Sequence, residues 1–240
     1  CIRDRPVKEQ SSVNGYVKQS FNHLETIYEG CFLLRELSPK TLAKVSSFGE
    51  LLSSYIITKA ANVSLKAVYK DTRELIVASD NYNNALVNFS TTFKNCQDYF
   101  LPHKQRVTIV PGFVARTING KTTTLGRGGS DFTAAIISAA LDCSELQIWT
   151  DVSGMFTANP SIVKQASVID HISYHEAMEL SHFGAKVIYP PTIQPVLQKE
   201  IPIVIKNTFK PADQGTLITK ETSKNKPVKG ISHICLLYTS

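Results

Sequence analysis

The sequence predicts an α/β protein with a largely parallel sheet covered by helices on both faces. Three observations predict this class. Apolar segments of strand length alternate with segments in which apolar residues recur at helical spacing. A glycine-rich loop separates a buried strand from an apolar helix. The 240 residues, 42% of them hydrophobic and 19% charged, suit one large globular domain.

The first third of the chain is predicted to be mainly helical. Apolar residues recur at helical spacing over residues 15–37. Ser38 and Pro39 then supply an N-cap and a first-turn proline for a second helix that reaches about Ala61. Residues 63–69 follow as a strand, and residues 83–99 as another helix.

The rest of the chain alternates strands and helices. We expect strands at 106–115, 145–150 and 201–206, with helices at 131–141, 176–183 and 192–199, and a turn at 152–154. In a parallel sheet the ligand lies at the carboxyl ends of the strands. The glycine-rich loop and the pair Thr150 and Asp151 both fall at such ends, so we expect the ligand site there.

The loop at 122–131 is predicted to bind an anion. Its three glycines let backbone N–H groups approach a ligand, and Arg127 adds a rigid fork suited to a carboxylate or phosphate. An apolar helix follows, and a helix N-terminus favours negative charge. The loop is neither a dinucleotide fingerprint, because Asp131 is not small, nor a P-loop, because Ala115 is not glycine. The alternative is that Ser130 only caps the helix.

Composition excludes several classes of function. Lysine and arginine number 26 against 20 acidic residues, but four of the lysines lie at 220–229 and no basic stripe with interleaved aromatic residues occurs, so we expect no nucleic-acid partner. No apolar run approaches the roughly 18 residues that cross a bilayer, and no signal-peptide core is present, so we expect a cytoplasmic protein without a membrane partner. Five cysteines without ligand spacing predict neither disulfides nor a zinc site.

Four segments carry a family resemblance. They are Ser-Phe-Gly-Glu-Leu-Leu-Ser-Ser at 47–54, Thr-Thr-Leu-Gly-Arg-Gly-Gly-Ser-Asp at 123–131, Ile-Trp-Thr-Asp-Val at 148–152 and Phe-Gly-Ala-Lys-Val-Ile-Tyr-Pro at 183–190. Together, and in this order, they resemble the aspartate kinases of the amino-acid-kinase family. The run at 172–182 looks most like the kinase part of bifunctional aspartokinase/homoserine dehydrogenases.

The resemblance implies a fold and an activity. The fold is the amino-acid-kinase fold, a three-layer α/β/α sandwich with a mainly parallel sheet. The activity is transfer of the ATP γ-phosphoryl group to the β-carboxylate of L-aspartate, the first step toward lysine, threonine and methionine. That carboxylate, with a reference pKa of about 3.9, is ionised at neutral pH and needs no general base. Mg²⁺ would arrive with ATP, bound mainly by phosphate oxygens and water, so no metal site built from protein side chains is expected.

Site residues are carried over from the family motifs. For aspartate, the resemblance implies that Arg127 clamps a carboxylate and that the Gly128 and Gly129 amides and the Ser130 hydroxyl bind nearby. It also implies that Glu50 accepts the α-ammonium group and that Asp131 orients the reacting groups. Arg127 and Asp131 would be the catalytic pair. Two alternatives stay open: Glu50 as a solvated helix carboxylate, and Asp131 as a residue that only favours a helix N-terminus.

On the nucleotide side, the resemblance implies that Thr150 and Asp151 hold the adenosine portion of ATP. Lys186 and Val187 would complete that pocket, although Lys186 without its motif would be interpreted as a surface lysine. Phe156 and Ser161 stand where the family usually has tyrosine and an arginine that faces the phosphates. We therefore expect weakened contact with the nucleotide phosphates, and Phe156 can serve as a packing residue.

The expected organisation is a kinase domain at 7–220 and a linker at 221–234 toward a missing ACT regulatory region, with non-native ends at 1–6 and 235–240. The family's N-terminal Lys-Phe-Gly-Gly-Thr-Ser segment, a strand and phosphate loop, does not occur in the sequence, which leaves the activity of this chain open. The full-length protein is expected to be a homo-oligomer.

Two alternative functions remain at this stage. One is a kinase of the same fold for another acid, such as glutamate or carbamate; Glu50 together with Arg127 favours an α-amino acid over carbamate. The other is a non-catalytic ligand-binding or assembly module, which the absent phosphate loop favours. Phosphoryl transfer that depends on aspartate separates these possibilities.

Overall fold

The structure is a computed structural model that describes residues 7–82, 85–103, 107–182, 187–221 and 228–231. It divides into two compact units, one up to Thr133 and one from Ala134 onward. Both contain helices and mostly parallel strand pairs, so the predicted α/β class is confirmed. Among the described helices, none has the length and apolarity required to cross a membrane.

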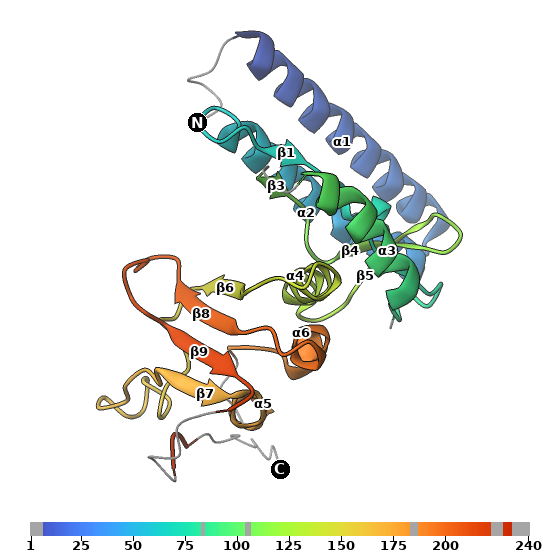
Figure 1. Cartoon of the computed structure of the whole chain (residues 1–240). Coiled ribbons are helices and arrows are strands. Elements are labelled where there is room, and N and C mark those ends of the chain that lie inside the picture. Colours follow the sequence, from blue (N-terminus) through green and yellow to red (C-terminus); the bar gives the residue numbers. More distant parts are fainter. Residues whose placement is uncertain (1–6, 83–84, 104–106, 183–186, 222–227, 232–240) are drawn as a thin grey trace. The chain divides into compact units, whose positions relative to one another are not determined.

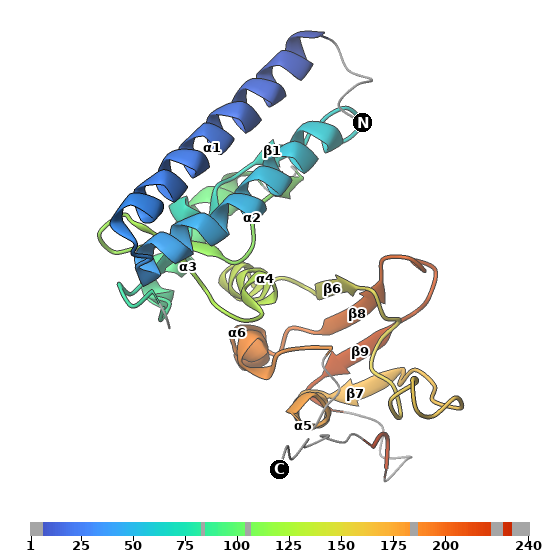
Figure 2. The same ribbon diagram turned by 180° about the vertical axis from the view of Figure 1, so that it is seen from behind.

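Two long helices begin the first unit: α1 (Val7–Leu34) and α2 (Pro39–Ala61) (Figures 1 and 2). They pack against each other, with the rings of Tyr16 and Tyr55 stacked at a centroid distance of 4.0 Å. Helix α1 starts earlier than predicted and runs through Gly15, because buried Val13 anchors its first turns. Helix α2 has the predicted bounds, and the Oγ of Ser38 accepts a hydrogen bond from the Thr41 N–H at 3.2 Å.

The remaining elements of the first unit are short. They are β1 (Val68–Tyr69), η2 (Thr72–Glu74), β2 (Val77–Ala78), α3 (Phe89–Phe100), η3 (Leu101–His103), β3 (Thr108–Ile109), β4 (Val114–Thr117) and β5 (Thr122–Thr124). Strand β1 pairs in parallel with β3, β2 pairs in parallel with β4, and β5 runs antiparallel to β4. Helix α2 packs against β5, β1 and β3, which places its length beside these strands.

Besides the start of α1, three predicted boundaries in this unit are wrong. The strand expected over residues 63–69 forms only at its last two residues, because residues 62–64 make a turn that extends the end of α2. The helix expected over 83–99 begins at Phe89, after Asn88 caps it by accepting a hydrogen bond from the Thr91 N–H at 3.1 Å. The Asn88 cap sets the start of the helix, although apolar residues at helical spacing continue toward residue 83.

The third wrong boundary lies within the strand expected over 106–115. It is two strands, β3 and β4, separated by residues 110–113, which include Pro111, Gly112 and Phe113. Proline lacks the N–H that a ladder needs, and Phe113 has a left-handed backbone with φ of 68°. Strand β5 was not predicted, because residues 122–124 directly precede the glycines and were expected to be part of the glycine-rich loop.

Helix α4 (Gly129–Ala140) begins in the first unit and continues into the second. The other elements of the second unit are β6 (Leu146–Thr150), β7 (His171–Ser173), α5 (Tyr174–His182), η4 (Pro190–Ile193), α6 (Gln194–Gln198), β8 (Ile203–Asn207) and β9 (Thr216–Thr219). The sheet has the order β6-β8-β9-β7, with β6 parallel to β8, β7 parallel to β9, and β8 antiparallel to β9. Strands β7 and β9 were not predicted, and β9 ends where the linker was expected to begin.

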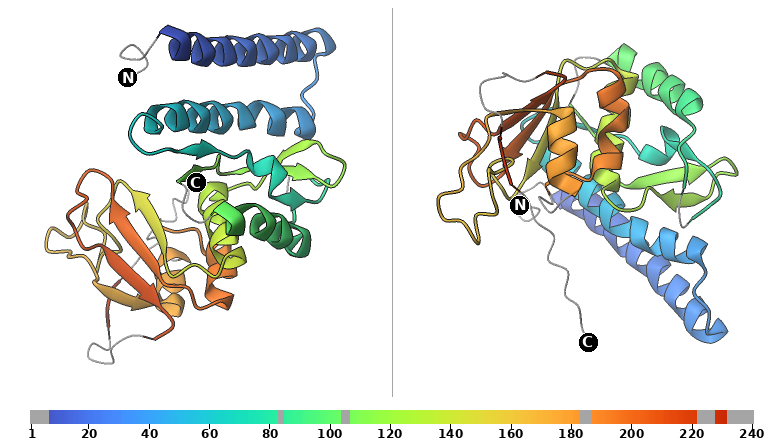
Figure 3. Two further views of the ribbon diagram at one scale, coloured as in Figure 1. Left: turned by 45° about the horizontal axis from the view of Figure 1, so that its top comes forward. Right: turned by 90° about the horizontal axis from the view of Figure 1, so that it is seen from below.

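Alternation along the strands of the second unit separates a buried face from an exposed one. Ile203 and Ile205 are fully buried in a core beneath α5 and α6, which lie on the same side of the sheet (Figure 3). The hydroxyl of buried Tyr174, at the start of α5, donates to the Ile201 carbonyl at 2.5 Å. On the other face, Gln147 and Trp149 are exposed. One face therefore supplies the packing of this unit.

The Ser38 cap can be tested by mutation. Ser38→Ala is expected to lower the free energy of unfolding by about 1 kcal/mol, because the first turn of α2 loses its side-chain acceptor. The matched control is Ser46→Ala in the middle of the same helix, where the exposed serine caps nothing and alanine is the better helix former. Urea unfolding followed by circular dichroism measures both, and equal losses would show that the cap contributes nothing specific.

Candidate active site

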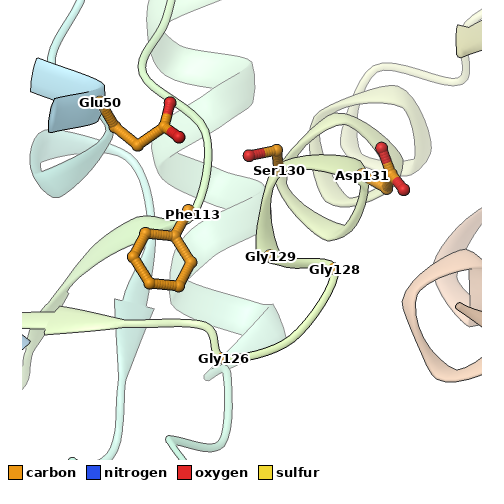
Figure 4. A pocket seen from close by; sticks show the side chains of 7 residues that line it. All are labelled: Glu50, Phe113, Gly126, Gly128, Gly129, Ser130 and Asp131. Carbon is orange, nitrogen blue, oxygen red and sulfur yellow. The ribbon is translucent and has the colours of Figure 1, made fainter. Parts of the chain in front are cut away.

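A pocket of about 330 Å³ lies between helix α2 and the glycine-rich loop, within the first unit. Its lining residues are Glu50, Phe113, Gly126, Gly128, Gly129, Ser130 and Asp131 (Figure 4). Five of the seven were predicted as site residues, from two segments far apart in the sequence. The fold thus brings Glu50 to the loop that was predicted to bind an anion.

The loop owes its shape to its glycines. Gly126 and Gly128 have φ of 73° and 68°, in the left-handed region that glycine adopts without strain. The Gly129 N–H donates to the Gly126 carbonyl at 3.0 Å, which closes a tight turn directly before α4. In the first turn of α4 the Gly129 and Phe132 N–H groups donate to the Gly126 and Gly128 carbonyls, so the Ser130 and Asp131 N–H groups are the ones placed to face an anion.

Phe113 is a lining residue that the sequence analysis missed. Its N–H is held by the Gly129 carbonyl at 3.2 Å and by the Thr133 hydroxyl at 3.0 Å, which fixes the left-handed backbone. Its ring forms a wall of the pocket between Glu50 and Gly126 (Figure 4). A bulky residue with positive φ is uncommon and clusters at functional sites. No local signal predicts it, because the restraining hydrogen bonds come from α4.

The two carboxylates of the pocket have different orientations. The Glu50 carboxylate and the Ser130 hydroxyl point toward one another across the pocket, whereas the Asp131 carboxylate points away from Glu50 (Figure 4). Glu50 is therefore placed to accept a cationic group and Ser130 to donate to an anionic one. Burial raises the pKa of the Asp131 carboxyl above its ordinary value. Arg127 is exposed on the same loop and is not among the lining residues.

The predicted nucleotide residues lie in the second unit. Thr150 ends β6, its hydroxyl donates to the Asp151 carboxylate at 3.2 Å, and its carbonyl accepts a hydrogen bond from the Thr208 N–H at 2.9 Å. The pair therefore lies at the carboxyl end of a strand, as predicted, beside the end of parallel strand β8. Asp151 is exposed, so its carboxylate is open to a ligand.

The other nucleotide candidates follow along the chain. Half-buried Phe156 pairs with Val168 in an isolated antiparallel bridge. Ser161 is exposed, and its N–H and hydroxyl both donate to the Asn159 side-chain oxygen, at 3.0 and 2.7 Å. Val187 is partly buried and packs against the core of the second unit, and Lys186 lies outside the described residues.

Within the described residues, no three or more histidine, cysteine, aspartate or glutamate side chains form a cluster suited to a metal ion. Cys31, Cys96 and Cys143 are free thiols. Burial raises the pKa of the Cys96 thiol to about 12, so this thiol is protonated at neutral pH and unreactive.

Comparison with known proteins shows which family the chain belongs to. Residues 8–207 match the family model described as the amino acid kinase family. The chain belongs to the amino acid kinase family. This match falls inside the predicted kinase domain and covers both the pocket and the end of β6.

Individual members of the amino acid kinase family resemble the chain closely. The bifunctional aspartokinase/homoserine dehydrogenase of Buchnera aphidicola is 38% identical over 222 residues, which are 91% of this chain and 27% of that protein. Lysine-sensitive aspartokinase 3 of Escherichia coli is 34% identical over 212 residues, which are 85% of this chain and 47% of that protein. The predicted resemblance to aspartate kinases is confirmed, and the chain spans about a quarter to a half of the length of these relatives.

A solved structure of the family supports the same likeness. The crystal structure of E. coli aspartokinase III in complex with aspartate and ADP superimposes with a TM-score of 0.82 at 31% sequence identity. The match covers 88% of this chain and 47% of that one. The amino-acid-kinase fold that the motifs implied is therefore confirmed.

Asp131 gives a testable dependence of stability on pH. Because its pKa is raised in the fold, the ionised form is destabilising above the folded pKa, and this effect vanishes below the unfolded value of 3.8, where both states are protonated. Asp131→Asn is therefore expected to raise the free energy of unfolding at pH 7.5, with a gain that shrinks as the pH falls toward 4. Urea unfolding across this range measures it.

The control for this prediction is Asp98→Asn, which removes an equivalent charge from an exposed position on α3. No comparable gain is expected there. A loss of stability in Asp131→Asn at pH 7.5 would show that attraction between the carboxylate and the N-terminus of α4 outweighs the effect of burial.

Proposed function

We propose that this chain is the catalytic region of an aspartate kinase, which transfers the γ-phosphoryl group of ATP to the β-carboxylate of L-aspartate and yields 4-phospho-L-aspartate and ADP. The observation that carries the proposal is the placement of Glu50 opposite the N-terminal turn of α4 across one pocket. A carboxylate facing an anion-binding loop suits an amino acid, whose ammonium and carboxylate groups have opposite charges. The aspartokinase relatives and the neighbour solved with aspartate and ADP support the same substrates.

Each group of the pocket has a proposed role in binding aspartate. Glu50 accepts the α-ammonium group through charge-assisted hydrogen bonds. Arg127, which lies on the same loop but is not a lining residue, clamps a carboxylate, and the Gly128 amide and the Ser130 hydroxyl donate nearby. The Gly129 amide, which also donates to the Gly126 carbonyl, lies beside them. The Phe113 ring offers an apolar wall against the short carbon chain of the substrate, which favours a compact amino acid.

The chemistry requires positioning and charge neutralisation. A β-carboxylate oxygen attacks the γ-phosphorus in line, the bond from phosphorus to the bridging oxygen of ADP breaks, and ADP leaves with that electron pair. Since the carboxylate is ionised at neutral pH, no proton has to be removed. The barrier is the approach of two anions, which Arg127 and the amides of the loop lower by neutralising charge as it develops. Asp131 orients the reacting groups at the head of α4.

The nucleotide is proposed to bind at the carboxyl end of β6. Thr150 and Asp151 would hold the adenosine portion together with Lys186 and Val187, and Phe156 would pack beside them. Mg²⁺ enters as part of the MgATP substrate, bound by phosphate oxygens and water. We further propose a cytoplasmic, homo-oligomeric full-length enzyme at the first step toward lysine, threonine and methionine.

The test of the proposal is formation of aspartyl hydroxamate from aspartate, ATP, Mg²⁺ and hydroxylamine. Glu50→Gln removes the charge that faces the ammonium group, a contact worth roughly 1.5–3 kcal/mol. The KM for aspartate is therefore expected to rise on the order of 10- to 100-fold, while the KM for ATP changes less than about twofold. Glu36→Gln, at an exposed position between α1 and α2, is the matched control and should change neither.

Direct binding and alternative acceptors complete this test. Calorimetric titration with aspartate separates binding from turnover, and the assay is run on the chain as it stands and with the family's Lys-Phe-Gly-Gly-Thr-Ser segment supplied. Activity with glutamate in place of aspartate would assign a different amino acid. Folded protein that binds neither substrate and is inactive in both forms would contradict the proposal and leave an assembly module as the better account.

Ser161 gives an independent prediction for the nucleotide side. Ser161→Arg restores the arginine that the family motif places near the phosphates, and it is expected to lower the KM for ATP by roughly tenfold through one charge-assisted contact. Position 161 is exposed, so the larger side chain meets no packing constraint. Ser144→Arg adds the same charge at the amino end of β6 and serves as the control. Equal effects in both variants would assign the change to net charge, and no effect would contradict the alignment of this loop.

A further inference from the structure

We infer that Ser153, held between Asn207 and Asp213, is a positioning residue for nucleotide binding. Its hydroxyl joins the loop after β6 to the loop after β8. The inference rests on the proposed function, because the loop after β6 begins with Thr150 and Asp151, the residues proposed to hold adenosine. Ser153 lies outside the set that the family motifs assigned.

The two strands bring both loops to one place. Strands β6 and β8 run in parallel and in register, with Thr150 opposite Asn207. The Thr208 N–H then donates to the Thr150 carbonyl at 2.9 Å, which continues the pairing to the start of both loops. After Thr150 and Thr208 the ladder hydrogen bonds between the two strands end, so other contacts have to hold the two loops together.

Side-chain hydrogen bonds form that connection. The Ser153 hydroxyl donates to the Asp213 carboxylate at 2.6 Å and accepts from the Asn207 side-chain amide at 2.9 Å. Asn207 is only 6% exposed, and its amide oxygen accepts from the Phe209 N–H at 2.9 Å. The Asp213 carbonyl accepts a hydrogen bond from the Lys206 ammonium group at 2.6 Å. A hydroxyl suits the central position because it donates and accepts at the same time.

Close backbone packing also fixes both loops near the residues that Ser153 joins. Gly154 has φ of 139°, and a Cβ there would lie 2.3 Å from the Thr216 hydroxyl oxygen, which accepts a hydrogen bond from the Met155 N–H at 2.8 Å. Gly215 has φ of 82°, and a Cβ there would lie 1.9 Å from the Ile205 carbonyl oxygen. Both loops are thus packed against strands β8 and β9 at Gly154 and Gly215, and the Ser153 hydroxyl connects the two loops beside these positions.

This arrangement matters for affinity because ordering a loop on binding has an entropic cost. Thr150 and Asp151 precede Ser153 by three and two positions, and Asp151 is exposed. With the loop already held by Asn207 and Asp213, the nucleotide meets groups whose positions are set in advance. Ser153 is not proposed to contact the nucleotide. Removal of its hydroxyl should nevertheless weaken nucleotide binding specifically, because Thr150 and Asp151 would be less well positioned.

The test compares Ser153→Ala with Ser153→Thr, which keeps the hydroxyl, and with the control Ser144→Ala at the exposed amino end of β6. Titration calorimetry with MgADP gives the Kd, and the hydroxamate assay gives the KM for ATP and for aspartate. Ser153→Ala is expected to weaken MgADP binding and to raise the KM for ATP by about tenfold each. The KM for aspartate should stay within about twofold, Ser153→Thr should recover most of the loss, and Ser144→Ala should match the parent chain.

Each other outcome has a definite meaning. A lower melting temperature with unchanged MgADP affinity would overturn the inference and make Ser153 a structural residue only. A parallel rise in both KM values, or no recovery in Ser153→Thr, would overturn it as well. If the parent chain binds MgADP but forms no aspartyl hydroxamate, with or without the Lys-Phe-Gly-Gly-Thr-Ser segment, the proposed reaction fails while the calorimetric comparison still decides the role of Ser153. If the parent chain does not bind MgADP, both fail.

Discussion

The left-handed backbone of Phe113 is the constraint on which the pocket depends. Its N–H is shared between the Gly129 carbonyl and the Thr133 hydroxyl, so the start of β4 is tied to the first turn of α4. Packing at this junction is close: a Cβ on Gly112 would lie 2.8 Å from the Cα of Ser130, and one on Gly129 would lie 2.7 Å from the Phe113 ring. The loop, the helix N-terminus and the aromatic wall therefore share a single geometry, and a change in any of them would move the others.

The two sides of the pocket carry opposite charge. Glu50 offers negative charge on one side of the pocket, while the head of α4 offers N–H groups and a positive helix end on the other. A ligand with charges of both signs can satisfy both sides at once, which a simple phosphate or an amine cannot. Asp131 points away from Glu50 and is half-buried, which keeps the two carboxylates from competing for one cation.

Prediction from the sequence succeeded where local chemistry decides structure. The start of α2 followed from Ser38 and Pro39, and its end followed from the apolar spacing up to Ala61. Strands β6 and β8 followed from short apolar runs, which can be recognised without knowing their pairing partners. Glu50 and the glycine-rich loop were paired through their motifs, and the fold brings them together. Strands β2, β5, β7 and β9 were missed because runs of two to four residues carry too little periodicity, and β2 and β7 also pair with strands that are distant in sequence. The conformation of Phe113 was missed for the same reason, since its restraints come from another element.

The exposed indole of Trp149 has a practical consequence. It is the chain's one tryptophan, 46% exposed, and directly precedes Thr150 on β6. Its ring N–H donates to the Gln147 side chain at 3.0 Å, and the Lys206 ammonium group lies 5.7 Å from the ring centroid. Intrinsic tryptophan fluorescence from this protein therefore originates at a single site beside the loop that Ser153 holds. The emission spectrum is an optical reporter of that strand end and needs no attached dye.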